Sequence, residues 1–317
     1  MTESVGPPIT VADSSARPSF GLTDLLLFTM ATIWGINFVV VKYATRSFNP
    51  LAFTGLRVAC VAVFLLIVAF VRDRNSEPKT NRRSLFKRVS REDLVRLLLA
   101  GVIGNGLYQL FFVLGVARTL AGNAALIVAA APAFIALVAR AKRIERVRRR
   151  VLLGIGLSIL GVGLVIAGSA KSTAGQSTLL GSILVFFGVL SWTLYTIVLQ
   201  PLTKRVDVIT LSAITMVGGA VPLLIVSGPA ILGSDWSRIG GGAWLALLYA
   251  SIISMGVAYL FWYRGLKVLG PTRTAVYANL QPFVTLLVAW ATLGENPTLF
   301  QGIGAVTIIA GVFMTRA

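Results

Sequence analysis

About ten apolar runs, each close to the length of a membrane-spanning helix, follow one another from Leu22 to Met314. A hydrocarbon core about 30 Å thick takes about 20 apolar residues per helix, so the runs use up nearly the whole chain. Unpaired backbone groups are costly in lipid, which leaves helix bundles and closed barrels as folds. The runs do not alternate in polarity and are rich in Gly and Ala. The sequence therefore predicts an all-α membrane protein with ten transmembrane helices.

The ten helices are expected to form two similar halves. Residues 124–162 align with residues 274–312 at an offset of 150, which places Pro132 on Pro282. At an offset of 158, Trp34 falls on Trp192. Each half holds five helices, an odd number, so the second half must enter the membrane upside down. We expect a disordered cytoplasmic tail at 1–21, a first repeat at 22–168, a linker at 169–178 and a second repeat at 179–317.

The expected helices follow the apolar runs. In the first repeat they lie at about 22–41, 51–71, 94–116, 123–139 and 151–167. In the second they lie at about 179–199, 208–226 and 243–263, with the last two inside 274–312. An inverted repeat of this kind lets one protein open alternately to either side of a membrane around a central site. A secondary transporter is therefore the leading hypothesis.

The net charge of +18 is distributed as in a membrane protein rather than a nucleic-acid binder. Most of the 29 Lys and Arg lie in the tails and the even-numbered loops, and the opposite loops hold only Lys42, Arg46, Arg118, Lys171 and Arg238. This is the positive-inside pattern, with both termini cytoplasmic in the cell membrane. We expect no nucleic-acid partner, and the basic tracts are expected to contact lipid headgroups.

The chain lacks the residues that several kinds of catalytic or metal site need. Cys60 is the only cysteine, histidine is absent, and every acid falls in a tail, a loop or a helix end. We therefore expect no metal site, no cofactor, no catalytic residues and no proton relay through a buried carboxylate or imidazole. A Walker-type phosphate loop is absent as well. The sequence favours a uniporter or exchanger over an enzyme or an ATP-driven pump, and it leaves the oligomeric state open, with a monomer allowed.

Polar and aromatic residues near the middle of the helices are the candidates for a solute cavity. Several pairs share a helix face at i, i+3 or i+4 spacing, and such rings can bind an ammonium group. Helix packing with hydrogen-bonded polar tips is the alternative for each residue. The candidates are Trp34, Asn37, Arg57, Asn105, Tyr108, Gln109, Trp192, Tyr195, Tyr259, Tyr277 and Gln281. Trp262 and Tyr263 are instead expected in an interfacial aromatic belt.

Two prolines are expected to shape their helices, and four charged residues in or near the apolar runs are expected to have individual roles. Pro132 and Pro282 are expected to kink their helices and to give the cavity wall its shape. Arg57, inside an apolar run, either binds a solute carboxylate or extends to the headgroups. Lys42 is expected to be an interfacial anchor. Glu145 and Glu295 are expected to have structural roles in closing the turns after their helices.

The order and spacing of these motifs resemble those of the EamA-type members of the drug/metabolite transporter superfamily. The matching residues include Trp34-Gly35-Ile36-Asn37-Phe38, Asn49-Pro50, Ser191-Trp192, Gln281-Pro282 and Gly294-Glu295. The resemblance implies ten helices, a cavity between the halves, and export of a small metabolite such as an amino acid or a related amphiphile. The alternatives are exchange of phosphorylated or nucleotide-linked sugars, which would need more inward-facing cations, and a non-transporting receptor or scaffold.

Overall fold

The computed structural model describes residues 21–75, 89–142, 149–171 and 179–316. The expected N-terminal tail up to residue 20, the middle of the basic loop after the second helix, Glu145 and most of the linker lie outside these ranges. Within them the structure is helical throughout, as the sequence predicts.

Each half crosses the bundle five times. The first half contains α1 (Leu22–Ala44), α2 (Pro50–Asn75), α3 (Arg91–Gly101) with η3 (Val102–Leu107) and α4 (Tyr108–Arg118), α5 (Ala121–Val128) with α6 (Ala131–Ala141), and α7 (Arg149–Lys171). The second contains α8 (Leu179–Leu202), α9 (Val208–Leu232), α10 (Gly241–Leu248) with η5 (Tyr249–Val257) and α11 (Ala258–Val268), α12 (Pro271–Tyr277) with η6 (Ala278–Leu280) and α13 (Gln281–Leu293), and α14 (Leu299–Arg316). A short 3-10 turn, η4 (Trp236–Arg238), precedes α10. In the described residues eight of these crossings are long and apolar enough to span a membrane, and two apolar helices, Leu152–Gly168 and Leu299–Gly311, are shorter.

The repeat is visible in local backbone geometry. The π-helical segments η3 and η5 overlap when one is shifted by 150 residues, and so do the break at Ala129–Ala130 and the 3-10 turn η6. Pro132 and Pro282 each lie in the first turn of a new helix, directly after these breaks. A missing N–H costs little there, because the first turn has no intrahelical acceptor for it. The bend expected at each proline is thus a break in the helix.

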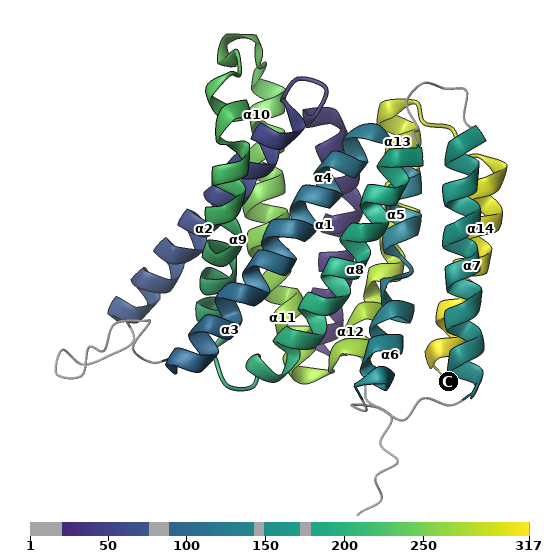
Figure 1. The fold of residues 1–317 in the computed structure, drawn as a ribbon, viewed down its shortest axis with the longest axis horizontal. Coiled ribbons are helices and arrows are strands. Elements are labelled where there is room, and N and C mark those ends of the chain that lie inside the picture. The colour runs from purple at the N-terminus through teal and green to yellow at the C-terminus, as the bar shows by residue number, and fades with distance from the viewer. Residues whose placement is uncertain (1–20, 76–88, 143–148, 172–178, 317) are drawn as a thin grey trace, which may run out of the picture.

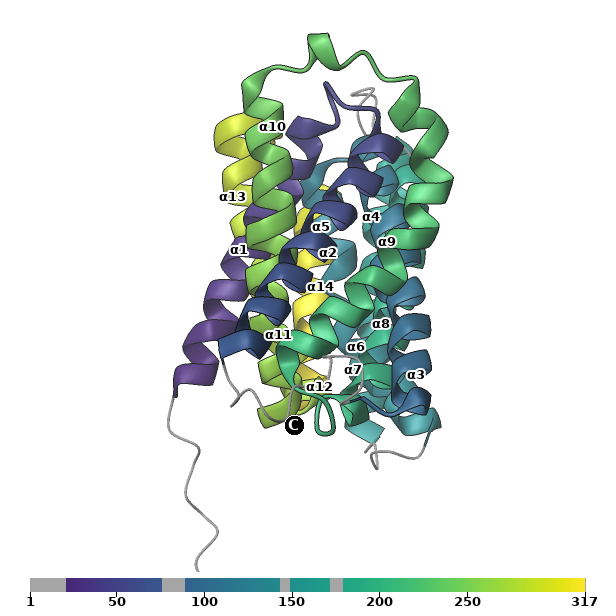
Figure 2. The same cartoon turned by 90° about the vertical axis from the view of Figure 1, so that its left-hand side faces the viewer.

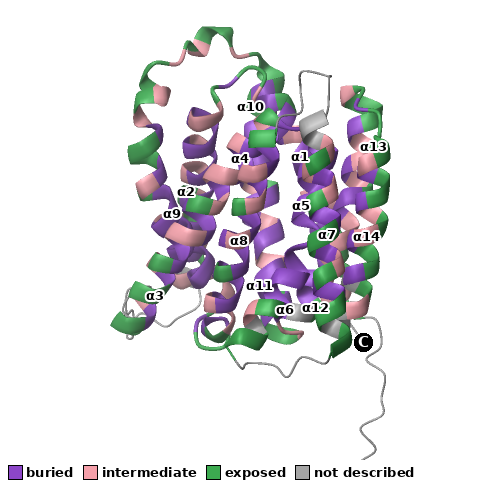
Figure 3. Ribbon diagram, turned by 45° about the vertical axis from the view of Figure 1, so that its right-hand side comes forward, coloured by how far each residue is buried: buried purple, intermediate pink, exposed green. Residues whose placement is uncertain are grey.

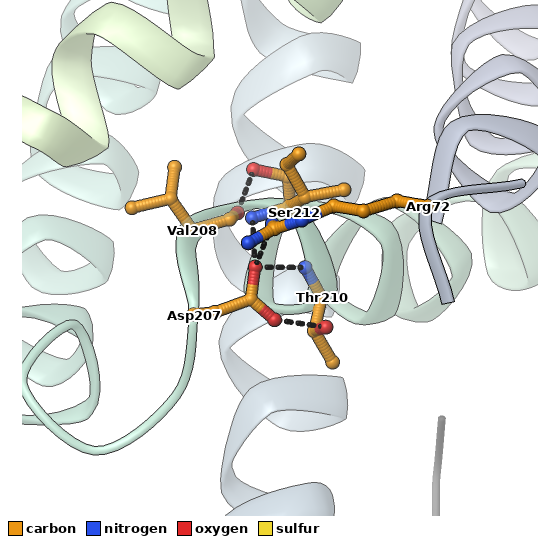
Figure 4. Close-up of polar contacts among 6 residues, drawn as sticks. Arg72, Asp207, Val208, Thr210 and Ser212 are labelled. Atoms are coloured by element: carbon orange, nitrogen blue, oxygen red, sulfur yellow. Dashed lines mark hydrogen bonds and ion pairs between the residues drawn. The ribbon is translucent and has the colours of Figure 1, made fainter. Parts of the chain in front are cut away.

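The starts of α2 and α9 are capped by equivalent residues. Asn49 Oδ1 accepts a hydrogen bond from Leu51 N at 2.9 Å, and Asp207 Oδ1 accepts one from Ile209 N at 3.0 Å. The two caps are 158 residues apart, which is the offset between the first helices of the halves. Asp207 also accepts a hydrogen bond from the Thr210 hydroxyl and pairs with Arg72 of α2 at 2.8 Å (Figure 4). That ion pair joins the end of α2 to the start of α9.

Helices of opposite halves pack in equivalent pairs. α7 packs along α14, and α2 along α9 (Figure 1). At the α7–α14 contact a Cβ on Gly161 would lie 2.9 Å from Ile308 N, and one on Gly311 would lie 2.5 Å from Gly154 O. These two glycines are 150 residues apart, so equivalent positions of the two halves make this contact. Only glycine allows the two backbones to approach this closely.

Burial follows the bundle arrangement. Buried residues run through the middle of the bundle, and α7, α9 and α14 carry exposed residues on their outer sides (Figure 3). The exposed residues include large apolar ones such as Phe283, Leu287 and Trp290 of α13, as expected of helices that face lipid. α1 begins and α14 ends at the same end of the bundle (Figure 2). We call this end the Asp207 side, and the opposite end, where α1, α4 and α13 finish, the Glu295 side.

Candidate functional site

A small pocket lies between the two halves. It provides about 30 Å³ for water, which is room for only one or two molecules. Its lining is mainly aromatic, with a few polar groups. The lining residues are Trp34, Asn37, Phe38, Arg57, Tyr108, Gln109, Phe112, Val128, Ala131, Trp192, Ser254, Tyr259, Trp262, Ala275, Ala278 and Gln281. We call this the central pocket.

Four aromatic rings from three helices form the centre of the pocket. The Trp34 and Trp192 rings are 5.7 Å apart and nearly perpendicular, at 86°. Tyr259 lies 5.6 Å from Trp34 and 5.5 Å from Trp192, and Trp262 lies 5.5 Å and 5.3 Å from the same two rings. Trp34 Nε1 donates to Ser254 O at 2.9 Å, which fixes the orientation of that indole. The two tryptophans that the repeat makes equivalent therefore meet at the pocket.

Polar side chains at equivalent positions of the two halves also contact each other at the pocket. Gln109 Nε2 donates to the Tyr259 hydroxyl at 2.7 Å, and these residues are 150 positions apart. Gln109 Oε1, Asn37 Oδ1 and Trp262 Nε1 are buried and have no hydrogen-bond partner among the described residues. Buried polar atoms without a partner are rare in folded proteins. The pocket thus offers two free acceptors and an indole donor.

Arg57 supplies the charge of the pocket. Its side chain is 2% exposed, its Nε donates to Met255 Sδ at 3.2 Å, and its guanidinium carbon lies 5.7 Å from the centre of the Phe112 ring. Its Nη1 has no hydrogen-bond partner, and no ion pair to it exists among the described residues. Of the two alternatives for Arg57, extension to the headgroups is excluded because the side chain points into the protein. A buried guanidinium without an anion is costly, so a bound anion would be favoured here.

Three of the predicted cavity residues lie elsewhere. Tyr277 donates to Asp24 near the Asp207 side. Asn105 and Tyr195 belong to a buried tyrosine cluster, completed by Tyr263 and Thr215: Tyr195 OH bonds to Tyr263 OH and lies 3.5 Å from both Asn105 Nδ2 and Thr215 Oγ1. By the repeat offsets, Tyr195 corresponds to Asn37 and Thr215 to Arg57. The second half therefore has an uncharged cluster where the first half has its cation.

The prediction of an aromatic belt at Trp262 and Tyr263 is wrong. Trp262 is 1% exposed and lines the central pocket, and Tyr263 is fully buried in the tyrosine cluster. The Trp262 ring packs against Trp34 of α1 and Trp192 of α8, and the Tyr263 hydroxyl bonds to Tyr195 of α8. The sequence carried a usable signal, because Trp262 follows Tyr259 by three residues and Phe112, its equivalent in the first half, also lines the pocket. Phe38, Phe112 and Ser254 are further lining residues that the sequence did not single out.

The expectation for Lys42 is also wrong. Its side chain is buried, and its Nζ donates to Thr119 O at 2.6 Å and to Ala117 O at 3.4 Å, so it does not reach the headgroups. Glu295 is structural in a different manner from the one expected: its Oε2 accepts from Ala121 N at 2.8 Å, on another helix. Burial raises the pKa of Glu295, although Lys42 and the Ala121 and Gly122 N–H groups oppose that change.

Comparison with known proteins shows which family the chain belongs to. The EamA-like transporter family matches residues 21–167 and 179–317, once for each half. The uncharacterized transporter YyaM of Bacillus subtilis is 29% identical over 91% of this chain and 91% of that protein. The uncharacterized inner membrane transporter YedA of Escherichia coli is 26% identical over 94% of this chain and 90% of its own length.

A solved crystal structure shares the fold. Its TM-score is 0.63 at 19% identity, and the match covers 92% of this chain and 96% of that one. At this identity the likeness concerns the fold alone. The family match over both halves, the inverted repeat and the pocket between the halves agree with one another. This chain is a multi-pass membrane protein of the EamA-like transporter family.

Proposed function

We propose that the protein exports a small amphiphilic metabolite, such as an amino acid or a related solute, by alternating access and without ATP hydrolysis. The observation that carries this proposal is the unpaired Arg57 guanidinium in an aromatic pocket between two inverted halves. An anionic group on the solute would supply the partner that Arg57 lacks. The surrounding rings would hold the apolar body of the solute.

The remaining groups of the pocket suit a solute that also carries an ammonium group. Asn37 Oδ1 and Gln109 Oε1 can accept hydrogen bonds, and the faces of Trp34 and Trp192 can attract a cation. Because the pocket has room for only one or two waters, the rings must move apart before such a solute fits. The bound form is therefore expected to be wider than the form seen here.

The lining also bears on how transport is driven. Among the described residues that line the pocket, Arg57 is the single cation and there is no carboxylate. We infer a uniporter or exchanger driven by the solute gradient, because the pocket has no acid that could carry a proton. Exchange of phosphorylated or nucleotide-linked sugars is less well supported, since a phosphate group with about two negative charges would favour more than one cation.

We assign the Asp207 side to the cytoplasm. Arg72, Arg91, Arg140, Lys204 and Lys267 lie on this side, where helices begin or end. The positive-inside rule then places both termini in the cytoplasm and the Glu295 side outside. Basic residues at the Asp207 side would face anionic lipid headgroups.

The test is thermal stabilisation of the purified protein by a panel of amino acids, other carboxylates and sugar phosphates. We expect zwitterionic or monocarboxylate solutes with an apolar body to raise the melting temperature, and Arg57→Ala and Trp192→Ala to abolish the effect. Trp290→Ala is the matched control, because Trp290 is 57% exposed on the lipid-facing side of α13. Stabilisation by sugar phosphates alone, or a response that survives Arg57→Ala, would contradict the proposal.

A further inference from the structure

Two buried charges at the Glu295 side belong to neither the central pocket nor the tyrosine cluster. Lys42, near the end of α1, is 6% exposed, and Glu295, just after α13, is 8% exposed. Lys42 is one of the positive charges that act on the Glu295 carboxylate. Buried charges usually have partners that compensate their desolvation. Lys42 Nζ and Glu295 Oε2 find such partners around one turn of the backbone, Thr119–Leu120, which we call the α4–α5 turn.

The two side chains bind opposite ends of neighbouring helices. Lys42 Nζ donates to the carbonyl oxygens of Ala117 and Thr119, at the C-terminal end of α4. Glu295 Oε2 accepts from the N–H of Ala121, the first residue of α5. A cation at a helix C-terminus and an anion at a helix N-terminus both match the helix dipole. The α4–α5 turn is therefore held by charge from α1 on one side and from the end of α13 on the other.

The helix that follows this turn closes the pocket from the Glu295 side. All eight residues of α5 are buried, and Val128 at its end lines the central pocket. A further bond between the halves, from Gln301 Nε2 to Asn123 Oδ1 at 2.8 Å, also holds α5. The equivalent helix of the second half, α12, is covered less completely, since Arg273 is exposed and Val276 and Tyr277 are half-buried. Of these two equivalent helices, α5 is therefore the more completely covered by its neighbours.

We propose that Lys42 and Glu295 are gating residues, which hold the α4–α5 turn against α1 and α13 and so keep the central pocket closed on the Glu295 side. The cavity opens to that side only when both charges leave the turn. The breaks at Pro132 and Pro282 keep their shape in this movement, and the contacts at the turn are what change. The inference rests on the proposed alternating access.

The direction of each variant's effect follows from the hydrogen bonds that it removes from the α4–α5 turn. Lys42→Met removes the ammonium group that donates to the Ala117 and Thr119 carbonyl oxygens, and Glu295→Ala removes the carboxylate that accepts from the Ala121 N–H. These losses act on the closed form, because water satisfies the same groups once the turn is exposed. Both variants therefore shift the equilibrium toward opening on the Glu295 side. Glu295→Gln keeps an oxygen that can accept from Ala121, so its effect should be smaller.

The experiment measures access to the pocket from each side of a membrane. Val128→Cys is placed in a Cys60→Ser background, and a membrane-impermeant thiol reagent is added to vesicles of either orientation. We expect labelling from the Glu295 side to be about tenfold faster in Lys42→Met and Glu295→Ala than with both charges present, because a lost hydrogen bond to a charged group shifts a two-state equilibrium by at least this factor. Glu92→Ala is the control, since Glu92 lies exposed at the Asp207 side and pairs with Arg96.

Two results would overturn the proposal. The first is an unchanged labelling rate from the Glu295 side in both variants. The second is an equal increase from both sides, which would mean general loosening of the bundle. If Glu295→Ala does not fold, Lys42→Met carries the test, and Glu295→Gln should label at a rate between that of Lys42→Met and that of the protein with both charges. No solute is added, so a protein that fails to transport can still pass or fail this test, and the two failures remain distinguishable.

Discussion

Replacing Arg57 by Met is expected to raise the stability of the solute-free protein while removing its response to carboxylate solutes. The guanidinium is buried, and its Nη1 has no hydrogen-bond partner. Methionine keeps an unbranched chain of similar reach and suits the apolar surroundings of Phe112 and Met255. The change therefore removes a desolvated charge without leaving a large cavity.

The magnitude follows from the contacts that Arg57 makes. The cation–π contact with Phe112, at 5.7 Å, is worth about 0.5–2 kcal/mol, and the bond to the Met255 sulfur is weak. Burying an ion costs several kcal/mol even after relaxation of its surroundings. The free energy of unfolding should therefore rise by about 1–3 kcal/mol. Solute affinity should fall by about 10- to 150-fold for each charged hydrogen bond lost.

The assay is thermal melting of the purified variant with and without the solute that stabilises the wild-type protein best. Arg238→Met is the control, because Arg238 is exposed and its ion pair with Asp235, three residues earlier, is worth little. The melting temperature of Arg57→Met should exceed that of the wild type and should not respond to solute. A lower melting temperature with the solute response intact would show that Arg57 stabilises the solute-free protein and does not bind the solute.

Three further predictions concern the pocket, a cap and a helix contact. Trp192→Ala and Trp262→Ala should both abolish stabilisation by solute, because both rings line the pocket; a normal response in Trp262→Ala would remove it from the site. Although burial alone would raise the pKa of Asp207, its hydrogen bonds from Thr210 and Ile209 and its pairing with Arg72 hold that pKa below its usual value. Asp207 therefore contributes stability above the usual aspartate pKa that is lost as the pH falls through the lowered one. Asp207→Ala should remove this pH dependence and cost about 1 kcal/mol in chemical unfolding. Gly311→Val should destabilise the α7–α14 contact by about 1–3 kcal/mol or more, measured by melting, since a Cβ there would lie 2.5 Å from Gly154 O.

The sequence predicts most of the fold because hydrophobic length and the internal repeat are properties of the chain alone. The offsets of 150 and 158 correctly pair Trp34 with Trp192, which meet in the pocket, and Gln109 with Tyr259, which share a hydrogen bond. The helix ends differ from the expected ones by a few residues, because polar residues such as Arg91 and Lys171 continue the helices beyond their apolar parts.

The errors have a common physical origin. Residue spacing shows which side chains share a helix face but not which neighbour covers that face. Trp262 therefore looked interfacial although α1 and α8 supply rings around it, and Lys42 looked exposed although the α4–α5 turn receives its ammonium group. Tyr277 and Tyr195 are expected in the pocket from their spacing, but each hydroxyl has a polar partner outside it. Assigning such residues requires the packing of helices that are distant in sequence.

Under the proposed function, the pocket between the halves carries solute across the membrane by opening first to one side and then to the other. The most direct test is counterflow in proteoliposomes loaded with the stabilising solute, without ATP and without a proton gradient. We predict transient accumulation of labelled solute that Arg57→Ala abolishes and Trp290→Ala preserves. Solute binding without accumulation, or accumulation only in the presence of a proton gradient, would contradict transport by solute exchange.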